Sequence, residues 1–193
     1  LTPKQVVQKN CTDRKKPNIN KKEISSFLNS LEYPLYYIDF ETFQTAIPLF
    51  DNSKPYQQIP FQFSLHVVKK KGDKPKHISF LADGTKDPRL EFLQMLKDNL
   101  GNKGSIIVYY ESFEKGRIKE SIAAFPEYEE WGQGILDRVV DLLHPFKNFH
   151  FYHPNQKGSA SIKKVLPIFS KDVNYGDLVI SNGTDASLSY YKS

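Results

Sequence analysis

The chain has 193 residues, of which 39% are hydrophobic and 13% aromatic, and it carries a formal net charge of +5. This size and composition fit a globular domain with an aromatic-rich core, and no apolar run approaches the roughly 20 residues that a membrane-spanning helix needs. A single cysteine, Cys11, excludes internal disulfides and, with only scattered histidines, argues against a structural zinc site.

The first segment, residues 1–22, is polar and basic and lacks apolar periodicity, so we expect a basic arm or linker there. The predicted domain then covers residues 23–193. A helix is predicted to begin between Asn20 and Lys22, because apolar residues follow at helical spacing, and Pro34 ends it.

Three strands are predicted next. Residues 35–40 are apolar on both faces, which is typical of a central strand. Residues 59–68 alternate apolar and polar side chains and predict a half-buried strand. The Lys-Gly-Asp sequence at 71–73 predicts a hairpin turn, and residues 76–81 predict a third strand that is antiparallel to the second.

Helical signals dominate the remainder of the chain. Asp87 and Pro88 suit the cap and the first position of a helix, and Gly101 suits its end. Pro145 stops a later helical pattern. Four further elements are predicted from periodicity and capping residues: a strand over residues 105–110, a helix over 112–125, a helix over 131–143 and a short helix over 161–166.

This order of elements, three strands and then alternating helices and strand, predicts the α/β class. It resembles the ribonuclease-H-like architecture: a mixed sheet with three antiparallel strands first and then parallel strands, flanked by helices. In such sheets the chemistry gathers where strand ends and the start of a neighbouring helix converge.

Two carboxylates end the first strand, in the sequence Asp39-Phe40-Glu41-Thr42. A strand places residues i and i+2 on one face, so Asp39 and Glu41 are expected to project side by side. Paired carboxylates repel each other unless a cation lies between them, and hard oxygen ligands suit Mg²⁺ or Mn²⁺. The alternative is a solvated turn, which is the commoner context for this pattern taken alone.

A third carboxylate is expected at the start of the helix that follows the 105–110 strand. On that helix Glu114 shares a stripe with Ile118 and Ile122, which are expected to face the sheet. A buried carboxylate needs a partner. The alternative is a first-turn glutamate that reaches water and is stabilised by the helix dipole. Glu111 is the alternative carboxylate for this role and ranks second because it precedes the helix.

Asp141 lies in an otherwise apolar stretch of the predicted 131–143 helix, four residues after Asp137. A surface charge cluster would explain this pair, but the apolar surroundings make Asp141 the better candidate for a role near the site. Ser159 and Lys163 lie at a cap-like helix start, which could contact phosphate or be an ordinary helix N-terminus.

The first acidic motif, residues 39–42, resembles the first motif of the DEDD-type 3′–5′ exonuclease superfamily, which includes the proofreading exonucleases of DNA polymerases. Residues 110–114 resemble the second motif, although Glu114 stands where Asp is usual and lengthens the ligand by one methylene. The resemblance implies a two-metal nuclease using Mg²⁺ or Mn²⁺. Asp39 would bridge both ions, Glu41 would hold the nucleophile-side ion and Glu114 the second.

The same resemblance implies that Thr42 and Phe43 contact the substrate, with Phe43 stacking on the terminal base. The polymer, DNA or RNA, would lie over lysines and arginines, and the positive net charge permits that contact. Each basic cluster is equally explained as a solvated arm or hairpin tip. These clusters are residues 14–16, 21–22 and 69–71.

Three stretches, residues 33–42, 55–62 and 158–167, resemble the signatures of a bacterial family of domains of unknown function, number 2779, itself ribonuclease-H-like. The resemblance covers roughly residues 24–193. It implies a domain that often ends a longer protein, so that an upstream nuclease-like region of the same protein is an expected partner.

The last acid of the superfamily pattern has no clear counterpart in the chain. Three aspartates near the C-terminus lie in turn-like contexts: Asp172, Asp177 and Asp185. We therefore expect the final acid to lie beyond Ser193, so that the domain is truncated at its C-terminus and its site incomplete and inactive as it stands.

The sequence thus predicts a cytoplasmic nuclease with no membrane partner and with Asp39, Glu41, Glu114 and Asp141 as catalytic residues. Two alternatives stay open. One is a catalytically degenerate ribonuclease-H-like module that binds nucleic acid or a protein partner. The other is a pure interaction module for the upstream region.

Overall fold

The computed structural model describes residues 1–170 and 183–192. The chain forms two compact units. Unit 1 combines residues 1–31 with the segment that begins at Asp141, and unit 2 combines residues 32–140 with the C-terminal helix.

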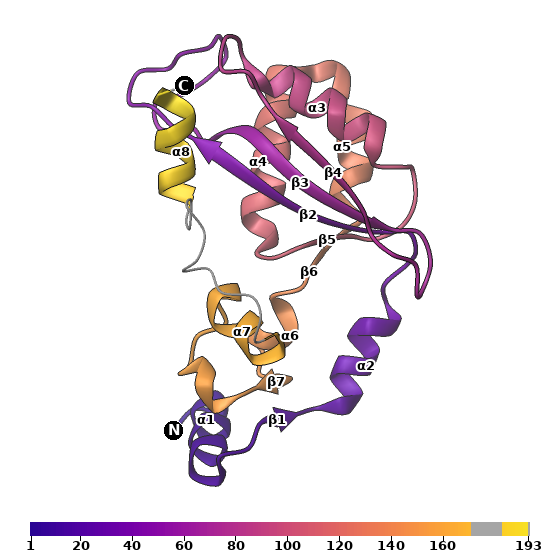
Figure 1. Cartoon of the computed structure of the whole chain (residues 1–193), viewed down its shortest axis with the longest axis vertical. Helices are drawn as coiled ribbons and strands as arrows, with labels where there is room; N and C mark the ends of the chain where they lie inside the picture. The colour runs from indigo at the N-terminus through magenta and orange to yellow at the C-terminus, as the bar shows by residue number, and fades with distance from the viewer. Residues whose placement is uncertain (171–182, 193) are drawn as a thin grey trace. The chain divides into compact units, whose positions relative to one another are not determined.

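A mixed sheet of five strands is the centre of unit 2, with the strand order β4-β3-β2-β5-β6 (Figure 1). β2 pairs antiparallel with β3, β3 pairs antiparallel with β4, and β2 pairs parallel with β5. The predicted order of three antiparallel strands followed by a parallel one is confirmed. The strands are β2 (Leu35–Phe43), β3 (Ile59–Val68), β4 (Lys76–Leu81), β5 (Ile106–Val108) and β6 (Val139–Asp141).

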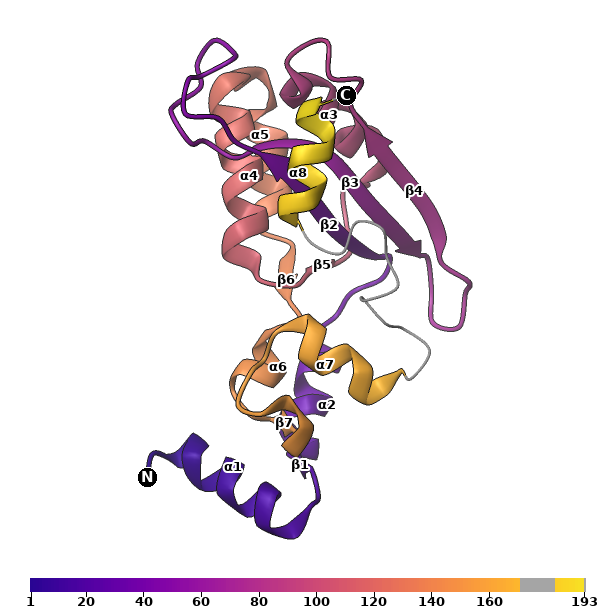
Figure 2. The same cartoon turned by 60° about the vertical axis from the view of Figure 1, so that its left-hand side comes forward.

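Helices cover the sheet, and α3, α4 and α5 lie together on one side of it (Figures 1 and 2). The C-terminal helix α8 lies along the carboxyl end of β2 in both views. The helical elements of unit 2 are α3 (Pro88–Asn99), α4 (Glu111–Ala124), the 3₁₀ turn η1 (Pro126–Tyr128), α5 (Glu129–Leu136) and α8 (Gly183–Lys192).

The core of unit 2 forms where α3 packs on the sheet. The apolar stripe of α3 is fully buried, with Phe92, Leu93 and Leu96 at 0% exposure. The Phe92 ring meets the Phe40 ring edge to face at 4.9 Å, and Phe63 of β3 is also 0% exposed. Full burial of one such side chain contributes roughly 1.5–3 kcal/mol, so this contact fixes the strand that carries the first acidic motif.

Unit 1 contains short elements from both ends of the chain. The strands β1 and β7 pair antiparallel, and Tyr152 of β7 is 1% exposed and stacks on Phe149 at 4.4 Å. The elements are α1 (Pro3–Arg14), β1 (Asn18–Ile19), α2 (Lys21–Asn29), α6 (His144–Lys147), β7 (Phe151–Tyr152), the 3₁₀ turn η2 (Pro154–Gln156) and α7 (Ile162–Phe169).

The predicted 131–143 helix is wrong in its second half. α5 ends at Leu136, and residues 139–141 form the edge strand β6. Short apolar runs fit a buried strand as well as a helix, which is why periodicity failed here. Asp137 and Asp141 therefore do not share a helix face, and the surface charge cluster considered for them does not form on one helix.

The first 22 residues contain more regular structure than their sequence indicated. Helix α1 begins after a Thr2 cap whose hydroxyl accepts the N–H of Gln5, while the Gln5 side chain accepts the N–H of Thr2. Cys11 is its only buried residue, so the helix has almost no apolar stripe to reveal it. The division into a basic arm and a domain at residue 22 stays a prediction.

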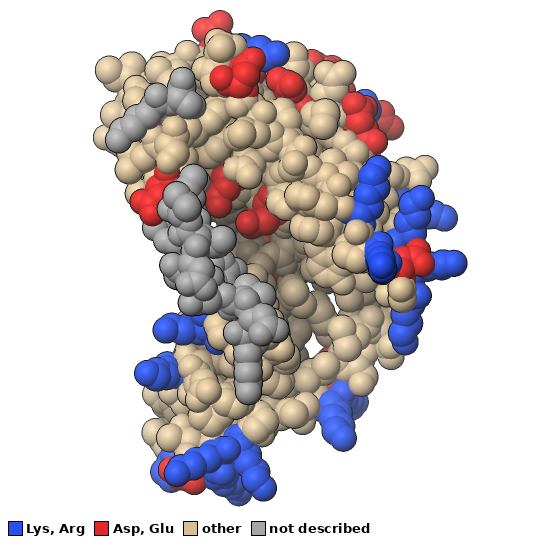
Figure 3. Space-filling view, in the orientation of Figure 1, with Lys and Arg blue, Asp and Glu red and all other residues tan. Residues whose placement is uncertain are grey.

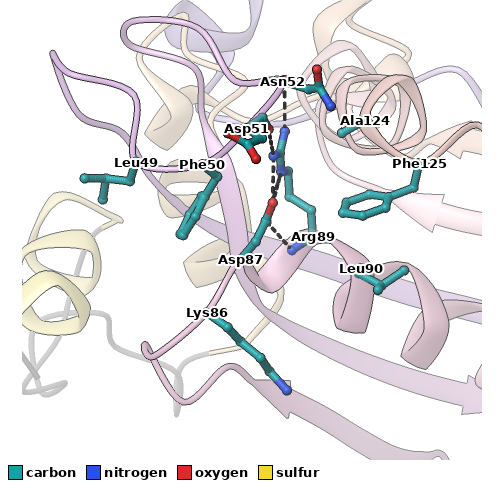
Figure 4. A pocket seen from close by; sticks show the side chains of 10 residues that line it. All are labelled: Leu49, Phe50, Asp51, Asn52, Lys86, Asp87, Arg89, Leu90, Ala124 and Phe125. Carbon is teal, nitrogen blue, oxygen red and sulfur yellow. Dashed lines mark hydrogen bonds and ion pairs between the residues drawn. The ribbon is translucent and has the colours of Figure 1, made fainter.

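A buried arginine fixes the long connection between β2 and β3. Arg89 is 1% exposed and pairs with Asp87, its Nη2 lying 2.7 Å from Oδ2. The same guanidinium donates to the backbone carbonyls of Asp51 and Asn52 at 2.6 and 3.2 Å. Figure 4 shows these bonds beside a cavity of about 490 Å³ that Phe125 also lines.

An Arg89→Met variant is expected to lose about 2 kcal/mol of unfolding free energy, because two loop carbonyls and one carboxylate lose their buried donor. Urea unfolding measures this loss. The exposed Arg14 provides the control, since Arg14→Met removes the same charge without a buried contact. Equal losses in the two variants would contradict a clamping role for Arg89.

Candidate carboxylate site

The first two predicted site residues lie within β2 and not at its end, because the strand continues to Phe43 instead of ending at Phe40. Asp39 lies opposite Ser64, and Glu41 lies opposite Gln62 of β3. The pairing register shifts directly after Glu41, and such bulges re-aim side chains beside functional sites. Asp39 is accessible to solvent, yet the atoms around it desolvate its carboxyl and raise its pKa. The strand thus presents two acids at a place where its geometry changes.

A sharp turn brings a third acid to the sheet. Tyr110, between β5 and α4, has φ +86°, a left-handed conformation that is uncommon for a residue with a side chain. Because α4 begins at the next residue, Glu114 falls in its first turn. The side chain of Glu114 is 2% exposed, as expected from the stripe that it shares with Ile118 and Ile122.

Glu114 is electrostatically coupled to both acids of β2. Burial, and after it the charge of Asp39, are the largest causes that raise the pKa of Glu114, whose value with all its surroundings is about 9. Arg117 lowers this pKa, Glu41 raises it, and a hydrogen bond from the backbone N–H of Phe40 lowers it. At neutral pH the Glu114 carboxyl is therefore protonated unless another positive charge arrives.

One oxygen of Glu114 lacks any partner. Its Oε2 atom is buried without a hydrogen bond. Leaving such an atom unpaired costs about 1–3 kcal/mol, and a cation would remove that cost. The three acids offer only oxygen ligands, which suit Mg²⁺ or Mn²⁺, so the residues present fit the predicted ion by their chemistry.

A ready-made metal cage is nevertheless not present in the described part of the chain. Within residues 1–170 and 183–192, no three His, Cys, Asp or Glu side chains lie close enough together to hold a metal ion. The acids influence one another through their charges, and they would have to draw together around an ion. The metal site stays a prediction.

Arg117 supplies a fixed positive charge one turn after Glu114. Its guanidinium donates to the side-chain oxygen of Gln58 and to Oε1 of Glu120, the latter at 2.9 Å. It also lies 5.0 Å from the centre of the Phe113 ring. The contact with Gln58 could not be predicted from the sequence, because these residues are 59 positions apart.

Helix α8 meets the same end of β2. A side chain at Gly183 would begin 3.1 Å from Oε2 of Glu41, so the first residue of α8 directly abuts this carboxylate. Near the other end of α8, Tyr190 stacks on Phe61 at 4.1 Å and contacts Phe43 at 5.3 Å. Phe43 is therefore 4% exposed and packed in the core. Stacking of Phe43 on a base stays a prediction, and it would require Tyr190 to move away.

The remaining predicted residues lie in other surroundings. Thr42 is half-buried beside the register shift and pairs with Pro60. Asp141 ends β6 and belongs to unit 1, where its Oδ1 accepts the N–H of Leu143. Ser159 and Lys163 also belong to unit 1. The Ser159 hydroxyl accepts the N–H of Ser161, which precedes α7. Roles for these residues at the site stay predictions.

The rival first-turn acid, Glu111, has a different environment from Glu114. Its side chain is 44% exposed and forms an ion pair of 2.8 Å with Lys115. Helix α4 begins at Glu111, so the expectation that Glu111 precedes the helix is wrong, and the ranking of Glu114 above it stays a prediction. Asp185 lies in helix α8 rather than in a turn, so that expectation is wrong, while Asp172 and Asp177 lie outside the described residues.

Most of the chain matches a known protein family. Residues 36–161 match the family described as "Domain of unknown function (DUF2779)". No solved structure matches the chain. Among residues 1–170 and 183–192, no helix has both the length and the apolar character needed to cross a membrane. Localisation in the cytoplasm stays a prediction.

Relatives occur in mycoplasmas and a ureaplasma. The chain is 31% identical over 173 residues to "Uncharacterized protein MG366" of Mycoplasma genitalium, covering 80% of this chain and 26% of that protein. It is 30% identical over 179 residues to the Mycoplasma pneumoniae homolog of that protein, covering 83% and 27%. It is 32% identical over 167 residues to "Uncharacterized protein UU173" of Ureaplasma parvum, covering 76% and 24%. The chain thus spans about a quarter of the length of these relatives.

Proposed function

The chain belongs to the DUF2779 family of domains of unknown function, and we propose that it is a nuclease domain. The proposed kind is the ribonuclease-H-like, DEDD-type 3′–5′ exonuclease. It would hydrolyse phosphodiester bonds of DNA or RNA with Mg²⁺ or Mn²⁺ as part of a longer protein. The observation that carries the proposal is the buried, partner-free Oε2 of Glu114 beside the charges of Asp39 and Glu41.

The fold supports this proposal in a limited way. The mixed sheet, with three antiparallel strands before a parallel one, is the arrangement expected of a ribonuclease-H-like domain. Glu114, in the first turn of α4, is influenced by the charges of Asp39 and Glu41 on β2, and such sheets carry their chemistry where strands and a helix start meet. Because unrelated functions share one fold, the acids carry more weight than the sheet.

In the proposed mechanism, Asp39, Glu41 and Glu114 would hold the divalent ion. When bound, that ion supplies an activated hydroxide near neutral pH and stabilises charge on the leaving oxygen. To hold an ion Glu114 would have to give up its proton to solvent, and added positive charge would lower the pKa that burial has raised. Arg117, held by Gln58 and Glu120, keeps a positive charge near Glu114 throughout.

A second candidate function is a catalytically degenerate module that binds nucleic acid or a protein partner. It is favoured by the absence of a ready metal cage within residues 1–170 and 183–192. A domain of this kind would keep the buried protonated Glu114 as a neutral hydrogen-bonding group of its core. Metal-dependent degradation separates the two candidates.

The test incubates end-labelled single-stranded DNA and RNA with Mn²⁺, using the natural protein with whatever sequence follows Ser193. The proposal predicts stepwise loss of nucleotides from the 3′ end, stopped by a chelator. No loss from either polymer, in a protein that is folded by circular dichroism, would overturn the nuclease proposal and favour the degenerate module.

A further inference from the structure

A second polar site lies in unit 2, at the opposite end of β2 from the acids. It is a cavity of about 520 Å³ whose lining includes Lys69, Lys76 and Lys103. We call it the lysine cavity. Lys69 and Lys76 flank the hairpin between β3 and β4, and Lys103 lies in the connection from α3 to β5.

Helix α3 is shorter than the strand β3 on which it packs, since its 12 residues span about 18 Å and the 10 residues of β3 about 33 Å. α3 ends at Asn99, which lines the cavity together with Val67 of β3 and Ile78 of β4. Val67 and Ile78 are partly buried against the core, so the lysines two residues away along each strand share their face. Lys69, directly after β3, and Lys76, the first residue of β4, thus line the hollow beyond the end of α3.

The charge in this region is strongly one-sided. Three lysines line the cavity against a single acid, Asp98. None of the three takes part in an ion pair within the described residues, so their charges are available to a ligand. The C-terminal end of α3, whose free backbone carbonyls carry partial negative charge, is the other negative contribution to the electrostatic potential of the cavity.

Positive charge continues past the cavity along the hairpin. Lys70, Lys71 and Lys74 are exposed there, with Asp73 as the one acid of the turn. Figure 3 shows Lys and Arg side chains gathered over this part of unit 2, whereas the opposite end of the sheet carries Asp and Glu. A ligand with one phosphate would use only the cavity, but a polymer of phosphates would use the whole row.

The cavity also offers an aromatic face. Tyr33 lines it and is 41% exposed, while the buried Tyr36 accepts the N–H of Gly101 through its hydroxyl. Lysines that follow a backbone beside an exposed aromatic ring are the combination with which proteins hold single strands. From this arrangement we infer that the lysine cavity and its hairpin bind the phosphates of single-stranded nucleic acid.

This inference deepens the proposed function, because it assigns a substrate-holding surface away from the acids, but it is tested without catalysis. Fluorescence anisotropy would measure binding of a short labelled single strand to the 193-residue chain in the presence of a chelator. A failed nuclease assay would then leave a positive binding result standing. Failure of this binding test would equally leave the acid site intact.

The decisive variant combines Lys69→Ala, Lys76→Ala and Lys103→Ala. Each lost phosphate contact lowers the slope of log affinity against log salt by about 0.7 on single strands, so we expect the slope to fall by about 2. The control combines Lys54→Ala, Lys119→Ala and Lys147→Ala, which removes the same charge from exposed positions outside the cavity and the hairpin. This control is expected to keep the slope of the unchanged protein.

Three results would overturn the inference. The first is an equal fall in slope for the two triple variants, which would show a response to net charge alone. The second is no salt-dependent binding by the unchanged chain. The third is displacement of the strand by inorganic phosphate at a concentration equal to that of the phosphate groups of the strand. That result would show a site for free phosphate instead of a polymer.

Discussion

A Glu114→Gln variant is expected to become more stable than the unchanged protein as pH rises. The pKa of Glu114 is raised from 4.5 to about 9 in the folded chain. Between these values the folded state holds a proton that the unfolded state has released, so rising pH favours unfolding. One such group lowers the unfolding free energy by up to about 1.4 kcal/mol per pH unit.

Gln resembles the protonated carboxyl and does not titrate. At about pH 5 the two proteins should therefore be equally stable. At about pH 8 the unfolding free energy of the variant should be a few kcal/mol higher than that of the unchanged protein. Urea unfolding at both pH values measures the difference. Glu111→Gln, on the same turn of α4, is the control and should change stability by less than about 1 kcal/mol, since Glu111 is half-exposed and ion-paired. Equal pH dependence in the unchanged protein and Glu114→Gln would refute a buried, protonated Glu114.

An Asp39→Asn variant is expected to lose Mn²⁺-dependent degradation of single strands by about 100-fold or more. Asn keeps the shape of the side chain but removes the charge that would bind the ion. Asp39 is accessible to solvent on β2, so the fold should tolerate the change. Initial rates of nucleotide release, with circular dichroism as the folding check, measure the effect.

Asp137→Asn supplies the matched control for that experiment. Asp137 is exposed, and its Oδ1 accepts a hydrogen bond from Gln133 that an Asn oxygen can also accept. The control should retain the activity of the unchanged protein. Comparable losses in the two variants would mean that a general loss of negative charge, and not a ligand at position 39, lowers the rate.

The strands of the sheet were predictable because their signal is local. The alternation over residues 59–68 and the apolar run that ends at Phe40 each follow from the two-residue period of a strand. β1 and β7 have only two residues each, too few for any period to show. The edge strand β6 was not predictable because residues 139–143, apolar except for Asp141, show no clear period.

The candidate site was predictable only in part. The spacing of Asp39 and Glu41 and the buried stripe of α4 indicated three acids near one another, and the pKa of Glu114 reflects that proximity. The contact of Gly183 with Glu41 could not be predicted, since it joins residues far apart in the chain. The left-handed turn at Tyr110 likewise depends on how β5 and α4 are packed, and no turn residue marks it.

The binding of Mn²⁺ by the acids of β2 and α4 is the central claim, and calorimetric titration near pH 7 in two buffers of different ionisation enthalpy tests it most directly. The account predicts binding accompanied by proton release, because a protonated Glu114 must ionise to become a ligand. It also predicts that Glu114→Gln abolishes the proton release and that Asp39→Asn abolishes or greatly weakens binding. Absence of binding, or binding that Asp39→Asn leaves unchanged, would contradict it.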